Sequence, residues 1–135
     1  MASNDKNNNV IRVQTSVSGN FFRIWVEFLT PIHNLTDREK DVLAEFIKQR
    51  FILAESISDE DILDKVIMSD DIKVKVRDTC GVSKAFFQMI MGKFKKTGII
   101  DSDGRINKKF IPKELNKKDK TFRFLLYFEL DEKYN

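Results

Sequence analysis

The stretch CGVSKAFFQMIMGKFKKTGII, from Cys80 to Ile100, constrains the fold of this chain more than any other part. Gly81 can adopt the left-handed backbone conformation that commonly ends a helix. Ser83 is a favourable N-cap residue, and the apolar residues after it recur at helical spacing until Gly98. The stretch therefore predicts a tight turn between two helices, with the second helix ending near Thr97.

The second of these helices separates into a buried side and an outward side when its residues are placed about 100° apart. The predicted buried side holds Phe87, Ile90, Met91 and Phe94. The outward side holds Ala85, Met89, Gly92, Lys93 and Lys96, and Phe86 and Gln88 lie on the flanks. This outward side is poor in groups that hydrogen-bond base edges, but its lysines suit phosphate contacts.

Three helices are predicted between residues 35 and 80, and the last of them is the helix that precedes this turn. LTDREKDVLAEFIKQRF carries a capping box, in which Thr36 and Glu39 satisfy amides of the first turn. SDEDILDKVI begins with Ser58 as its predicted cap, and Ser69 is expected to cap a short helix that ends at Gly81. These segments give the chain a mainly helical character.

The run FFRIWVEFL, residues 21–29, fits two structures. Its alternating apolar residues suit a strand, whereas the spacing of Arg23 and Glu27 suits an i,i+4 pair on a helix. The helical interpretation is preferred here, and the strand is kept as the alternative.

Three other segments predict β-structure. Residues 10–17, VIRVQTSV, alternate as a strand does, and KTFRFLLYFEL, residues 120–130, predicts a long final strand. Between them, Asp103-Gly104 in IIDSDGRI is a hairpin signal. Residues 1–9 are polar and are expected to be a disordered or partner-held tail, with a single domain over residues 10–135.

The sequence contains no recognisable set of catalytic or metal-ligating residues. One Cys and one His exclude an internal disulfide and a four-ligand zinc site from this chain alone. Cys80 is expected to be a small buried residue and His33 a loop residue, and the acidic run from Ser58 lacks the spacing of a calcium loop. No phosphate-binding glycine loop or Ser-His-Asp set is visible, so we expect no catalytic activity, cofactor or metal.

Charge is distributed unevenly. Residues 84–123 contain twelve Lys or Arg against four Asp or Glu, whereas residues 37–83 contain eight basic and twelve acidic side chains. A basic block of net charge +8 predicts a polyanionic or acidic partner, with a solvated charged face as the alternative. No apolar run approaches the roughly 18 residues that cross a bilayer, and no signal sequence is visible, so a cytoplasmic protein is expected.

The order of a short helix, the CGVS turn, a second helix, the FKKTGII stop and a Gly-tipped hairpin resembles the winged helix-turn-helix superfamily over residues 59–107. In that family the second helix lies in the major groove of DNA and the hairpin wing touches the backbone or the minor groove. The resemblance implies a mainly α fold with a small β component, here a winged helix-turn-helix with additional N- and C-terminal strands. One departure is Arg77, which stands where the family usually has a small residue.

The resemblance also implies a set of nucleic-acid-binding residues. Ser83, Lys84 and Gln88 are candidates for base edges, and Lys93 and Lys96 are candidates for phosphates. The wing would add Arg105, Lys108 and Lys109 as backbone contacts.

Two functions follow as hypotheses. The first is a nonenzymatic protein that binds double-stranded DNA, as a transcriptional regulator or replication accessory factor. The second is a protein-interaction or structural module, such as a phage virion or packaging component, with a protein partner or a homo-oligomer. Phe86 and Met89 and the two terminal segments would supply its interface. A virion location would accompany that second hypothesis.

Overall fold

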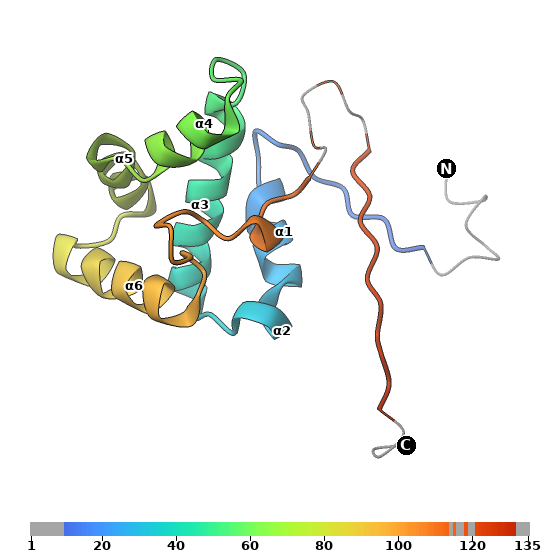
Figure 1. Ribbon diagram of the computed structural model, residues 1–135. Helices are drawn as coiled ribbons and strands as arrows, with labels where there is room; N and C mark the ends of the chain where they lie inside the picture. Colours follow the sequence, from blue (N-terminus) through green and yellow to red (C-terminus); the bar gives the residue numbers. More distant parts are fainter. Residues whose placement is uncertain (1–9, 114, 116–117, 119–120, 132–135) are drawn as a thin grey trace.

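The computed structural model describes residues 10–113, 115, 118 and 121–131, and the tail predicted for residues 1–9 lies outside them (Figure 1). Within the described residues the chain forms six α-helices and one short 3-10 helix. These are α1 (Phe21–Phe28), α2 (Thr30–His33), α3 (Asp37–Leu53), α4 (Glu60–Ile67), α5 (Asp70–Cys80), α6 (Lys84–Thr97) and η2 (Lys108–Phe110).

Helix α3 occupies the centre of the molecule. It packs against α1 on one side and against α4 and α5 on the other, and α6 lies beside it (Figure 1). The rings of Phe46 on α3 and Phe87 on α6 are 6.1 Å apart. Val42, Leu43 and Ile47 of α3 are also buried, so this one helix supplies the middle of the core.

The predicted start of α3 is confirmed. The Thr36 side chain accepts a hydrogen bond from the Glu39 amide, and the Glu39 carboxylate accepts one from the Thr36 amide. These reciprocal bonds satisfy two amides that have no partner inside the helix.

The caps around the helix-turn-helix are confirmed, with one correction further upstream. Ser69 and Ser83 cap α5 and α6, and Gly81 ends α5 in the left-handed conformation with φ 65°. Helix α4, however, is capped by Asp59 rather than by Ser58. The Asp59 carboxylate reaches the amides of both Asp61 and Ile62, which a serine one residue earlier would not reach.

Residues 21–28 form a helix, as the i,i+4 spacing favoured. Its buried face includes Phe22, Trp25 and Val26, and the Trp25 indole donates a 2.8 Å hydrogen bond to the Phe110 carbonyl.

The prediction that His33 is a loop residue is wrong. His33 is a buried residue of α2. Its Nε2 lies 2.8 Å from the Val26 carbonyl oxygen and its Nδ1 accepts from the Leu35 amide, so both ring nitrogens are used structurally.

The predicted β component and the predicted winged architecture are wrong for the part of the chain that the structure describes. No strand is present there, and the hairpin is reduced to an isolated antiparallel bridge between Ile100 and Ile106. Gly104 provides the predicted turn, with φ 77°. The pairing stops because the chain then folds into η2, which brings Phe110 into the core.

The predicted terminal strands are also wrong. Residues 10–16 and 121–131 run without regular secondary structure, outside the helical body (Figure 1). Their alternating patterns suit strands, but neither segment has a neighbouring described strand to pair with. The pattern was therefore a sign of β propensity without a local partner.

The packing of α6 leads to a stability prediction. Phe94 is 1% exposed, and Phe94→Ala should lower the free energy of unfolding by about 3–5 kcal/mol because it opens a cavity. Phe86, on the same helix, is 37% exposed, and Phe86→Ala should cost less than about 1 kcal/mol. Urea unfolding followed by circular dichroism measures both values, and equal losses would contradict this packing.

Candidate functional site

The outward face of α6, which we call the α6 face, comprises Lys84, Ala85, Gln88, Met89, Gly92, Lys95 and Lys96. All of these residues are exposed. The buried side of the helix holds Phe87, Ile90, Met91 and Phe94, as the helical spacing predicted. The α6 face is thus open to a partner along its length.

The residues predicted to contact base edges differ in whether their side chains already have a partner within the protein. The Ser83 hydroxyl accepts a 3.1 Å hydrogen bond from the Phe86 amide, so it serves as the cap of α6. Lys84, Lys95 and Lys96 make no ion pair with other described residues. Gln88 is exposed beside them.

Lys93, predicted to contact phosphate, is turned toward α3. Its Nζ lies 2.7 Å from the Glu39 carboxylate. Burial opposes ionisation of Glu39, but this bond and those from Thr36 outweigh it and lower the pKa of Glu39. Lys93 therefore joins α6 to the first turn of α3.

The basic residues after the hairpin loop are paired with acids of α4. Arg105 lies 2.9 Å from Asp61, and that hydrogen bond is the main cause of the raised pKa of Arg105. Lys108 lies 2.7 Å from Asp64 and 3.2 Å from Glu60. Two of the three predicted wing contacts are thus neutralised within the molecule.

Asp64 is the centre of this ion-pair network. Its side chain is 3% exposed and also accepts a 2.9 Å bond from Nε of Arg50 on α3. Burial opposes its ionisation, but the bonds from Lys108 and Arg50 outweigh burial and lower the pKa of Asp64. The network therefore connects α3, α4 and the segment that follows α6.

The hairpin loop is a poor phosphate contact. Asp101 and Asp103 stand at its turn, and the Asp101 carboxylate accepts bonds from the amides of Asp103 and Arg105. Lys109, the remaining predicted wing residue, places its Nζ 5.3 Å from the centre of the Phe110 ring. Carboxylates near the expected wing tip would repel a phosphate backbone.

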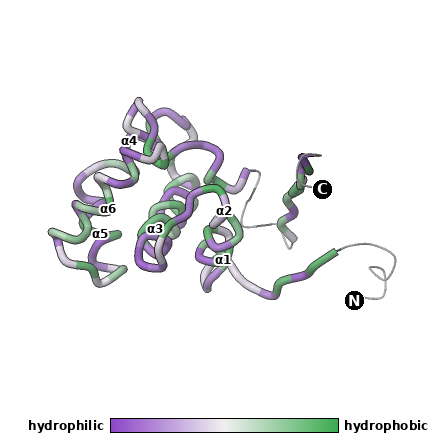
Figure 2. The backbone as a smooth tube through the Cα atoms, turned by 90° about the horizontal axis from the view of Figure 1, so that it is seen from below, coloured by the Kyte–Doolittle hydropathy of each residue, from purple (hydrophilic) through white to green (hydrophobic). Residues whose placement is uncertain are grey.

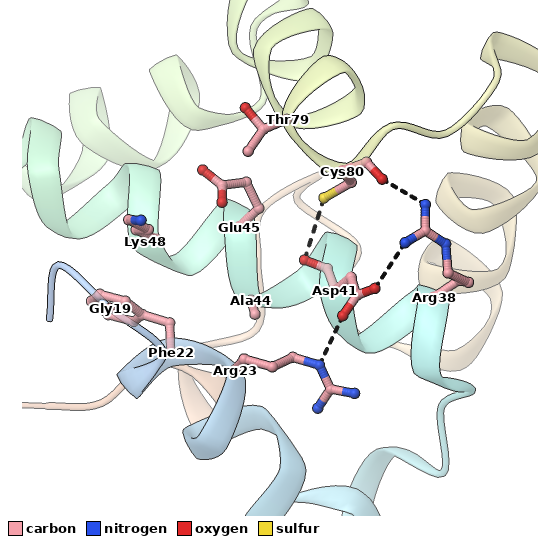
Figure 3. Close-up of a pocket in the computed structure, with 10 residues that line it drawn as sticks. All are labelled: Gly19, Phe22, Arg23, Arg38, Asp41, Ala44, Glu45, Lys48, Thr79 and Cys80. Atoms are coloured by element: carbon pink, nitrogen blue, oxygen red, sulfur yellow. Dashed lines mark hydrogen bonds and ion pairs between the residues drawn. The ribbon is translucent and has the colours of Figure 1, made fainter. Parts of the chain in front are cut away.

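A shallow pocket of about 270 Å³ lies between α1, α3 and the end of α5 (Figure 3). Asp41 bridges Arg23 and Arg38 across it, with 2.9 Å and 3.0 Å contacts. Cys80 also lines the pocket, but burial raises the pKa of its thiol to about 11, so the thiolate is scarce at neutral pH. The Arg23–Asp41 ion pair in the pocket joins α1 to α3.

The described residues contain no group of three or more His, Cys, Asp or Glu side chains that could hold a metal ion. None of their helices is both long enough and apolar enough to span a membrane.

The second candidate surface is residues 121–131, which we call the C-terminal arm. Its first part is held by α1: the Phe122 ring lies 5.5 Å from Phe21 and 5.6 Å from Trp25. Phe124 lies 5.1 Å from Trp25 and 6.4 Å from Phe28. Edge-to-face contacts of this kind stabilise and orient an aromatic pair.

The arm runs outside the helical body (Figure 1), and Figure 2 colours parts of it as hydrophobic. Five apolar or aromatic side chains there are between 56% and 80% exposed: Leu125, Leu126, Tyr127, Phe128 and Leu130. The sequence predicted a strand here, which is wrong, but its apolar alternation was the signal of a segment that needs a partner.

Comparison with known proteins does not add a family. No family model, no curated protein and no solved structure matches this chain.

The ion-pair network leads to a pH-dependent prediction. Asp64→Asn should lower the free energy of unfolding at neutral pH by about 1–3 kcal/mol, because Arg50 and Lys108 lose a buried partner. The folded pKa of Asp64 is depressed, so its contribution is present above about pH 4 and is lost as the pH falls through the folded value.

The difference between wild type and Asp64→Asn in urea unfolding should therefore shrink as the pH falls below about 4. Asp103→Asn, in the exposed loop, is the matched control and should change stability by less than about 0.5 kcal/mol. A difference for Asp64→Asn that stays constant with pH would contradict the network.

Proposed function

We propose that the protein is a nonenzymatic interaction module whose helical body presents the C-terminal arm to a protein partner. The observation that carries this proposal is the exposure of five large apolar or aromatic side chains, those of residues 125–128 and of Leu130. A role as a structural part of an assembly, such as a phage virion or packaging component, fits this chemistry.

The energetics of the arm support docking. Burying a Leu or Phe side chain contributes about 1.5–3 kcal/mol, so a surface that covered residues 125–130 would gain considerable affinity. The arm is extended, and an extended segment can add along the edge of a partner's sheet, where its backbone groups find hydrogen bonds. Contacts of Phe122 and Phe124 with α1 fix its base and reduce the ordering cost of binding.

The distribution of charge supports the same proposal over the DNA-binding hypothesis. Lys93, Arg105 and Lys108 are each bonded to carboxylates of α3 or α4. Exchanging those carboxylates for phosphates would leave acids unpaired near the DNA backbone, which costs interaction energy. These three of the twelve basic residues in the block therefore stabilise the fold.

A triple variant tests the arm. Leu126→Ser, Phe128→Ser and Leu130→Ser together should abolish arm-dependent association while leaving the melting of the helical body within a few degrees of wild type, since these side chains do not contribute to the core. Affinity purification from the native source, with quantitative mass spectrometry, compares the proteins retained by wild type and by the variant.

The matched control changes three exposed residues elsewhere, Ile52→Ser, Ile62→Ser and Val74→Ser, which removes similar apolar surface from the helical body. This control should retain the wild-type partner. If the arm variant retains the same partner in the same amount, the proposal is wrong.

DNA binding by the α6 face is a second candidate function. It is favoured by the exposed Lys84, Lys95 and Lys96, which have no described acidic partner, and by Gln88 beside them. Such a surface would grip phosphates with little sequence preference.

The test is a fluorescence titration of two unrelated duplexes at two salt concentrations. If the α6 face binds DNA, Lys84→Ala with Lys95→Ala and Lys96→Ala should reduce affinity at least about tenfold and flatten the salt dependence, because fewer counterions are released. Lys48→Ala, on α3, is the matched control. Equal binding by the triple variant and the control would exclude this face.

A further inference from the structure

We infer that the partner of the C-terminal arm is a second copy of this chain, and that the two arms pair antiparallel about a twofold axis at Leu126. This inference rests on the proposed docking role of the arm. It follows from the order of side chains between Phe122 and Leu130, which is complementary to itself when reversed.

The charges define the register. When Leu126 of one copy faces Leu126 of the other, Arg123 lies opposite Glu129 of the second copy. The twofold axis repeats the contact, so each dimer has two such pairs. Both side chains are exposed and neither makes an ion pair with another described residue, so both are available. Opposite charges placed directly across a strand pair stabilise it.

The same register matches the remaining side chains by type. Every other opposite pair is apolar or aromatic: Phe122 with Leu130, Phe124 with Phe128, and Leu125 with Tyr127. Cross-strand pairs that include an aromatic ring are among those that stabilise antiparallel strands. The arm thus has no mismatched position between Phe122 and Leu130.

Neighbouring registers are worse. A shift that centres the pair on Tyr127 places Arg123 opposite Asp131, but it also places Leu125 opposite the Glu129 carboxylate. A shift that centres it on Leu125 places Arg123 opposite Tyr127 and separates both charges from their partners. A register that places Leu126 of one copy opposite Tyr127 of the other puts the apolar faces of the two arms on opposite sides of the ribbon.

The helical body explains why two arms alone would suffice. An isolated two-stranded ribbon is only marginally stable in water. Here Phe122 and Phe124 already pack on α1, so one face of the ribbon lies on an aromatic surface formed with Trp25 and the half-exposed Phe28. In the paired arms Phe128 of the second copy lies opposite Phe124 and extends this surface.

Charge reversal tests the register directly. Sedimentation velocity over a hundredfold range of concentration should show a monomer–dimer equilibrium for the full chain. Arg123→Glu alone or Glu129→Arg alone should raise the dimer dissociation constant at least about tenfold, because each places like charges opposite one another twice. The double variant, R123E with E129R, should return to within about threefold of wild type, since it restores opposite charges.

Disulfide trapping tests the axis. In a Cys80→Ser background, Leu126→Cys should crosslink to itself on mild oxidation, because residues on the axis are about 4.5–5.5 Å apart at Cα. Leu125→Cys is the matched control and should crosslink poorly, since its two copies are diagonal neighbours beyond about 7 Å. Equal crosslinking of the two variants, or none in either, overturns the inference.

The outcomes separate this inference from the proposed function. If the wild type is a monomer at every concentration, self-pairing is overturned. The docking role still holds in that case if the serine variant of Leu126, Phe128 and Leu130 loses a different protein partner that the wild type retains. A dimer that neither single charge reversal weakens overturns the register. A wild-type dimer that the serine variant retains overturns both the inference and the docking role.

Discussion

The buried carboxylate of Asp64 is the constraint on which the helical body depends. A charge with so little exposure must be paired, and Arg50 from α3 and Lys108 from beyond α6 provide the partners. These bonds connect three separate parts of the chain. They also account for Lys108 after α6, since a cation that holds Asp64 in place is no longer available to an external polyanion.

The same logic extends to the other basic residues near α6. Lys93 secures the first turn of α3 through Glu39, and Arg105 secures the first turn of α4 through Asp61. Acidic side chains at helix starts interact favourably with the helix dipole, and the cations add to that stabilisation. The opposite net charges of residues 37–83 and 84–123 are thus complementary within one molecule.

The sequence predicted the helices well where local signals decide them. The capping box of Thr36 and Glu39 and the left-handed turn at Gly81 are short-range features, and both are present. The β-structure was mispredicted because a strand needs a partner, and periodicity in residues 121–130 carries no information on whether one exists in the same chain. The ion pairs joining Lys108 to Asp64 were also beyond sequence reasoning, since they connect residues 44 positions apart.

The unpartnered arm is the point at which local propensity and the folded chain disagree. Its sequence pattern favours a strand with a packed apolar face. Within the described residues, however, only the base of the arm is covered, by the aromatic side chains of α1. Such disagreement is expected at a functional site, where the missing contacts come from another molecule. The arm therefore connects the fold to its proposed function more directly than the helix-turn-helix does.

Amide hydrogen exchange of the arm, measured by mass spectrometry at low and high protein concentration, tests the central claim most directly. If the arms pair with one another, a peptide covering residues 122–130 exchanges almost at once in dilute protein and becomes protected at high concentration, whereas α3 is protected at both. Protection of the arm in dilute protein as strong as that of α3 would contradict intermolecular pairing, because the arm would then already have its partner within the chain.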